Sequence, residues 1–157
     1  MSKPVRPAIF AAAGVLAAAL SCVPAAAGDA TFATKADLGK ALFFDTNLSK
    51  NRTQACATCH DPDKGWGDGL ARAKGRKELA FHTPSVVGAA FNRWQFWDGR
   101  KDSLWSQALE PIEHPDEMAG SRTGVLHHIR RTPPLLELWA AAFGPFPSTA
   151  ALWATIS

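Results

Sequence analysis

Apolar residues along the chain recur three and four positions apart, and the strict alternation typical of a half-buried strand is scarce. Thr34 and Asp37 resemble a capping box, and the helix they predict carries Leu38, Leu42 and Phe43 on one face. We therefore expect the first helix to begin near Thr34.

Three more helices are expected further along the chain. Ser103 to Leu109 predicts one that is ended by Pro111. Another is capped by Ser121, and the last opens at Thr132-Pro133 and closes at Gly144. The inward residues of the Ser121 helix are Val125, Leu126 and Ile129.

Long irregular segments separate these helices at residues 44–55, 61–83 and 111–120. Loops of this length in a small domain usually carry function or are ordered by a bound group. The pattern predicts a mostly α fold with long loops.

The first 27 residues have the pattern of a secretory signal peptide. Lys3 and Arg6 precede an apolar, alanine-rich run from Ala8 to Val23, and Ala25-Ala26-Ala27 offers a small-residue cleavage site before Gly28. The apolar run, about 16 residues, is short for a bilayer-spanning helix of roughly 20 residues. We expect residues 1–27 to be removed, residues 28–157 to form the domain, and the mature protein to be periplasmic without membrane attachment.

The chain stops inside another expected helix. Ser148 or Thr149 can cap it, with Leu152, Trp153 and Ile156 at helical spacing, but no closing residue follows. We interpret the chain as a fragment or a truncated gene product.

Charge excludes one class of partner. The formal net charge is +3, and without Lys3 and Arg6 the balance is 15 basic against 14 acidic residues. A nearly neutral domain without a basic stripe is not typical of nucleic-acid binding.

The sharpest chemical feature is Cys56-Ala57-Thr58-Cys59-His60. Two thiols at this spacing can add to the vinyl groups of haem, and the adjacent imidazole can then bind the iron, which is the c-type attachment pattern. Zinc would need further ligands, a thioredoxin-like dithiol would need a βαβ context, and a structural disulfide is the plainest alternative. In an exported chain covalent haem is favoured, and its ring would replace missing core between the loops.

The sixth iron ligand separates two kinds of function. Met118 is the one methionine after the leader, and His60 with Met118 would give a low-spin electron-transfer cytochrome c. A peroxidase instead needs an open sixth site with an acid–base group beside it.

A series of short motifs resembles the N-terminal domain of the bacterial di-haem cytochrome c peroxidase family, which includes MauG-type enzymes. The resemblance runs from about residue 37 to the end of the chain in the family's order. It rests on these motifs: Leu38-Gly39-Lys40-Ala41-Leu42-Phe43-Phe44-Asp45, the haem motif with Asp61-Pro62, Thr83-Pro84-Ser85, Phe96-Trp97-Asp98-Gly99-Arg100, Gln107, Pro111 and Glu117-Met118.

The resemblance implies roles for individual residues. His60 would be the proximal ligand of the peroxidatic haem, Glu117 the distal carboxylate that moves a proton between the peroxide oxygens, and Gln107 the amide beside it. Trp97 would relay electrons between two haems. Independently of the family, Arg100 is either a partner for a haem propionate or a surface residue.

Three departures qualify the resemblance. Residues 61–81 contain no His to cap the iron, so the sixth site is expected to be open or capped by another group. His82 stands where the family usually has Asn before Thr-Pro, which puts the family's calcium site in doubt. No second Cys-x-x-Cys-His motif occurs, so the second haem would have to come from another domain or chain.

The expected function is therefore that of a cytochrome c-like peroxidatic domain with one covalent haem. The complete enzyme would reduce hydrogen peroxide with electrons from a small redox protein, a cytochrome c or a cupredoxin. The alternatives are the His60/Met118 electron carrier and a non-catalytic haem-binding fragment.

Overall fold

The computed structural model describes residues 30–148, and the predicted leader and the expected helix after Ser148 lie outside this range. The described chain is built from helices of very different lengths. They are, in order, α1 (Ala30–Phe43), η1 (Thr46–Leu48), α2 (Cys56–Cys59), η2 (Pro62–Lys64), η3 (Ala89–Phe91), α3 (Leu104–Glu113), α4 (Arg122–Arg131) and α5 (Pro133–Phe143).

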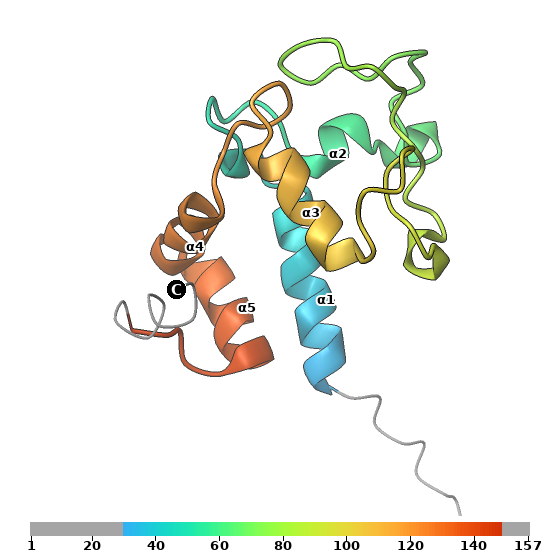
Figure 1. Cartoon of the computed structure of the whole chain (residues 1–157). Coiled ribbons are helices and arrows are strands. Elements are labelled where there is room, and N and C mark those ends of the chain that lie inside the picture. The colour runs from blue at the N-terminus through green and yellow to red at the C-terminus, as the bar shows by residue number, and fades with distance from the viewer. Residues whose placement is uncertain (1–29, 149–157) are drawn as a thin grey trace, which may run out of the picture.

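The apolar core lies between α1, α4 and α5, which stand side by side in Figure 1. Leu38 of α1, Ile129 of α4 and Leu135 of α5 form its buried centre, and Leu42 and Trp139 pack around them. Each such side chain contributes about 1.5–3 kcal/mol when it leaves water. The helices at the two ends of the described chain therefore hold each other in place, and the segments between them carry the chemistry.

Most predicted helix ends are confirmed. Ser103 caps α3 by accepting a hydrogen bond from Ser106 N at 3.3 Å, and Ser121 caps α4 through Gly124 N at 3.0 Å. Thr132 precedes the proline that opens α5, and Gly144 closes it.

Two boundaries differ from the prediction. The helix α1 begins at Ala30, so Thr34 lies inside it and does not cap it, because the preceding alanines favour helix. The helix α3 continues through Pro111 to Glu113. A proline this near the end removes one hydrogen bond, and His114 N still donates to Glu110 O at 2.8 Å to close the last turn.

Between α1 and α3 the described chain forms long loops, drawn green and yellow in Figure 1. Their β pairing is confined to isolated bridges at Asp61–Gly67, Lys74–Glu78 and Gln95–Lys101. The mostly α prediction is confirmed for residues 30–148. Within that range no helix is both long enough and apolar enough to span a bilayer.

Candidate functional site

The two cysteines of the attachment motif lie on α2, a single helical turn. Thr58 fixes its start by accepting a hydrogen bond from Ala55 N at 2.9 Å, and His60 N donates to Cys56 O at 2.9 Å at its end. One turn brings residues three apart onto the same face. The local geometry thus presents both sulfur atoms together, with the imidazole directly after them.

Both thiols are free and partly buried. Burial raises the pKa of Cys56, and it raises the pKa of Cys59 with help from the carboxylates of Asp68 and Glu117. Within residues 30–148 no group of three metal-binding side chains forms, so the zinc alternative finds no support there.

His60 is oriented by the loop that follows it. Its Nδ1 lies 3.2 Å from the carbonyl oxygen of Trp66, so Nδ1–H donates and Nε2 keeps the lone pair. Burial lowers the pKa of His60, against the opposing effect of the Trp66 and Pro84 carbonyls. A neutral imidazole with its second nitrogen held by a carbonyl is the arrangement that proteins use for a metal ligand.

Glu117 lies on a short segment after α3 that two loops hold from either side. Lys50 N donates to Met118 O at 3.0 Å from one loop. From the other, Arg76 N and Lys77 N both donate to Asp116 O, at 2.7 and 3.1 Å. Gly75 makes this approach feasible, since a Cβ there would lie 2.5 Å from Asp116 O.

The environment of Glu117 differs from that of a surface carboxylate. Its side chain is 22% exposed. Burial raises the pKa of Glu117, while the positive charges of His114 and Arg100 oppose the rise. The carboxylate is also close enough to Cys59 to affect that thiol. The segment thus brings an acid–base group toward the attachment helix.

Gln107 and Met118, the other two residues predicted near the iron, differ in how far they are buried. Gln107 is partly buried in the second turn of α3. Met118 is buried at 5% exposure, and its N–H donates to Pro111 O at 3.1 Å.

Trp97 lies in the loop before α3 and is 53% exposed. Its indole N–H donates to His82 O at 3.0 Å, and the two rings are 4.5 Å apart between centroids. This loop holds the indole by both its edge and its face, although much of the ring remains at the surface.

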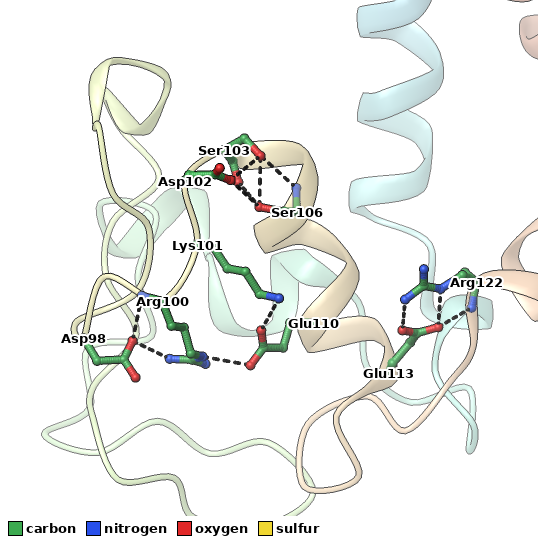
Figure 2. A network of polar contacts seen from close by, with 9 residues as sticks. All are labelled: Asp98, Arg100, Lys101, Asp102, Ser103, Ser106, Glu110, Glu113 and Arg122. Carbon is green, nitrogen blue, oxygen red and sulfur yellow. Dashed lines mark hydrogen bonds and ion pairs between the residues drawn. The ribbon is translucent and has the colours of Figure 1, made fainter. Parts of the chain in front are cut away.

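Arg100 is bound by acidic neighbours (Figure 2). Its Nε donates to Glu110 Oε1 at 2.8 Å and its Nη1 to Asp98 Oδ1 at 2.8 Å, while Lys101 also pairs with Glu110 at 3.3 Å. The guanidinium lies 3.5 Å from the centroid of the Phe96 ring. A haem propionate would have to share Arg100 with these two carboxylates, and its role as a propionate partner stays a prediction.

Apolar side chains remain exposed beyond the core, mostly in the loops and at the start of α3. Phe91 is 93% exposed and Trp105 76%. The remaining large ones are Phe44, Leu70, Phe81, Val87, Trp94, Trp97, Leu104 and Phe143. So much uncovered aromatic surface is consistent with a large apolar group that packs against these loops.

Two free thiols on one turn, an imidazole with a fixed tautomer, and aromatic loops fit covalent haem attachment. The fold and the site define a helical c-type haem domain. Residues 33–157 match the family described as di-haem cytochrome c peroxidase, and the chain belongs to this family.

Similar proteins agree with this assignment. The chain is 46% identical to the methylamine utilization protein MauG of Methylorubrum extorquens over 70% of its own length and 32% of that protein. It is 37% identical to cytochrome c551 peroxidase of Nitrosomonas europaea over 87% of its length and 42% of that protein. The chain therefore spans about a third to two fifths of these relatives.

Solved structures show the same fold. The diheme peroxidase BthA of Burkholderia thailandensis matches with a TM-score of 0.61 and 32% identity, over 71% of this chain and 33% of that one. A MauG-like protein associated with microbial copper homeostasis matches with a TM-score of 0.66 and 27% identity, over 78% of this chain and 38% of that one.

Sequence reasoning missed the residues that hold the Glu117 segment. Gly75 and the backbone of Arg76 contact Asp116 from about 40 positions away, which no local pattern reveals. The bond of 2.6 Å between His128 Nε2 and Asp45 Oδ2 was missed for the same reason. His114, three residues before Glu117, was visible in the sequence as a polar neighbour.

Proposed function

We propose that this chain is the peroxidatic domain of an exported, periplasmic enzyme that reduces hydrogen peroxide to water. One haem c would be attached through Cys56 and Cys59 and bound at iron by His60. Bound there, the haem supplies the iron centre at which peroxide binds and accepts electrons.

The observation that carries the proposal is the position and protonation chemistry of Glu117. It lies on a segment fixed by hydrogen bonds from two loops, and its side chain is largely buried. Its negative charge also helps to raise the pKa of Cys59 on the attachment turn. Burial raises the pKa of Glu117, which favours its taking up a proton, and a carboxylate can both take and return a proton, as O–O cleavage requires.

Other side chains of the chain would support this chemistry. Gln107 would hydrogen-bond the bound peroxide through its amide. Trp97 would pass electrons inward from a second haem, on another domain or chain, that receives them from a cytochrome c or cupredoxin. The indole N–H held by His82 O keeps the ring in one orientation, which favours a relay role. Calcium between the two haem domains stays doubtful because His82 replaces the usual Asn.

The test is an EPR and optical spectrum of the exported, haem-loaded protein before and after peroxide is added. High-spin ferric iron that reacts with peroxide supports the proposal. Low-spin iron with a Met–iron charge-transfer band and no reaction would support ligation by Met118 and contradict it.

Two variants separate the roles. Glu117→Gln keeps the shape of the side chain but removes its acid–base function, so we expect it to slow the peroxide reaction by about 100-fold or more without reducing haem attachment. Trp97→Phe should leave the reaction with peroxide intact and slow the later delivery of electrons. An unchanged peroxide reaction in Glu117→Gln would remove the proton-transfer role.

A further inference from the structure

Peroxide reduction consumes protons as well as electrons: one hydrogen peroxide, two protons and two electrons give two waters. The proton that Glu117 takes from one oxygen and returns to the other is balanced within the bond cleavage. Both protons of this balance are taken up with the two electrons, and they must come from solvent and reach a carboxylate that is 22% exposed. If Glu117 acts as proposed above, it needs a route by which protons arrive.

His114 is the titratable side chain that faces Glu117 at closest range among the contacts of the described residues. It ends α3, and its Nδ1 lies 4.0 Å from Glu117 Oε1. Its backbone oxygen accepts hydrogen bonds from Glu117 N at 3.1 Å and Ala119 N at 2.9 Å. The tight turn that these bonds form keeps the two side chains together.

The tautomer of His114 is set by its neighbour. Asp116 N donates to His114 Nδ1 at 3.2 Å, so the neutral ring carries its hydrogen on Nε2. When the ring is protonated, the added proton is on Nδ1, the nitrogen nearest Glu117. An imidazole can carry a proton on either ring nitrogen, so it can take up a proton and release it.

His114 also reaches solvent, because its side chain is 38% exposed and lines an open hollow of about 520 Å³ beside α3. Water in this hollow can reach the ring. The charged residues that line the hollow with His114 are Lys101, Glu110, Glu113 and Arg122. Asp116, paired with Lys77, lies next to the His114 ring. The lining of the hollow therefore combines charged side chains with the apolar side chains of Trp105 and Leu109.

We propose that His114 is a positioning residue that passes protons from the hollow to Glu117. The protonated ring gives its Nδ1 proton to Glu117 Oε1. The N–H bond breaks, an O–H bond forms, and no electrons are transferred. The neutral ring is then held by the Asp116 N–H until water in the hollow protonates Nδ1 again. A protonated Nδ1 cannot accept the Asp116 N–H, so the charged ring leaves that bond and closes the 4.0 Å gap to hydrogen-bond length by a side-chain movement of about 1 Å.

His114→Asn is the diagnostic substitution. The Asn side-chain oxygen can take over the hydrogen bond from Asp116 N, but it cannot carry a proton at neutral pH. His127→Asn is the matched control, since His127 is exposed on α4. In haem-loaded protein supplied with an artificial one-electron donor, we expect His114→Asn to slow steady-state peroxide turnover, which takes up the two solvent protons, about 10-fold. The loss should be recovered as the concentration of a weakly acidic buffer is raised, whereas His127→Asn should react as the unaltered protein does.

A second measurement reports on the pair without relying on activity. The carboxyl stretch of Glu117, identified by its absence in Glu117→Gln, can be followed with pH by infrared difference spectroscopy. Loss of the nearby positive charge in His114→Asn should move the midpoint of that titration to higher pH.

These outcomes separate the relay proposed for His114 from the acid–base role proposed for Glu117. A slow His114→Asn with buffer recovery and a displaced carboxyl titration supports the relay. A normal rate in His114→Asn, or a slow rate with neither recovery nor displacement, overturns it. If His114→Asn is normal while Glu117→Gln is slow, only the relay is wrong. If Glu117→Gln reacts normally, the proposed role of Glu117 and the relay are both refuted.

Discussion

The contact between Gly75 and the Glu117 segment gives a perturbation whose size can be worked out from the structure. A Cβ at Gly75 would lie 2.5 Å from Asp116 O and 3.0 Å from Glu117 Cα. Comfortable carbon contacts begin near 3.5 Å, so Gly75→Ala must displace the segment by about 1 Å. The backbone at Gly75 does not have a positive φ, so the effect of the substitution is steric alone.

Two consequences of Gly75→Ala can be separated by assay. Overpacking of this kind costs about 1–3 kcal/mol in the free energy of unfolding, which thermal denaturation measures. A displacement of about 1 Å in a proton-transferring group can slow its reaction about 100-fold, which rapid mixing of haem-loaded protein with peroxide measures. The expected signature is a large loss of rate with haem attachment retained.

Gly39→Ala is the matched control, because nothing lies within 4 Å of the Cβ it would add within α1. Alanine there should stabilise the helix by up to about 1 kcal/mol and leave the peroxide reaction unchanged. The reasoning is refuted if Gly75→Ala reacts with peroxide and unfolds as the unaltered protein does.

Three further substitutions or conditions test the scaffold. Asp45→Asn weakens the 2.6 Å bond to the half-buried His128 and should lower the free energy of unfolding at pH 7 by about 1–2 kcal/mol in a denaturant titration. Hydrogen bonds from Arg122 lower the pKa of Glu113 to about 2, from an ordinary 4.5. Its stabilising contribution is therefore complete above about pH 4.5 and lost as the pH falls toward 2. Because the pair is exposed to solvent, this loss should be small and should shrink further in high salt, and melting curves from pH 5 to pH 2 with Glu113→Gln as reference would show it. Ser103→Ala should cost about 1 kcal/mol by removing the N-cap of α3, and equal melting temperatures would contradict this.

What the sequence predicted well is structure within a few neighbouring residues. The spacing of Cys56, Cys59 and His60 places all three on one turn and its end. Ser103 and Ser121 cap helices because the N–H groups they accept from lie three residues ahead. Such relations are encoded locally, so no knowledge of the tertiary fold is needed to find them.

What the sequence could not predict depends on contacts between distant segments. The residues Gly75 to Lys77 fix Asp116 through backbone atoms, which leave no side-chain signature. Arg100 lies among acidic side chains of its own loop and of α3, and only the folded chain shows that Arg100 and Lys101 both pair with Glu110. The helix end at Pro111 was misplaced because a proline in the last turn costs less than one in the interior.

Apolar residues stabilise the helices α1, α4 and α5 differently from the loops between α2 and α3. The helices α1, α4 and α5 bury Leu38, Ile129 and Leu135 against each other. Between α2 and α3 large side chains such as Phe91 remain exposed, so these loops gain little by folding alone. Covalent haem would supply the apolar partner that the loops lack. Hydrogen exchange should therefore show α1 and α5 equally protected in haem-loaded protein and in a Cys56→Ala/Cys59→Ala variant, with loop protection strongly reduced in the variant. Equal loop protection in the two proteins would mean that the loops are ordered by their own hydrogen bonds, and the haem would then have no part in organising the segment that carries Glu117.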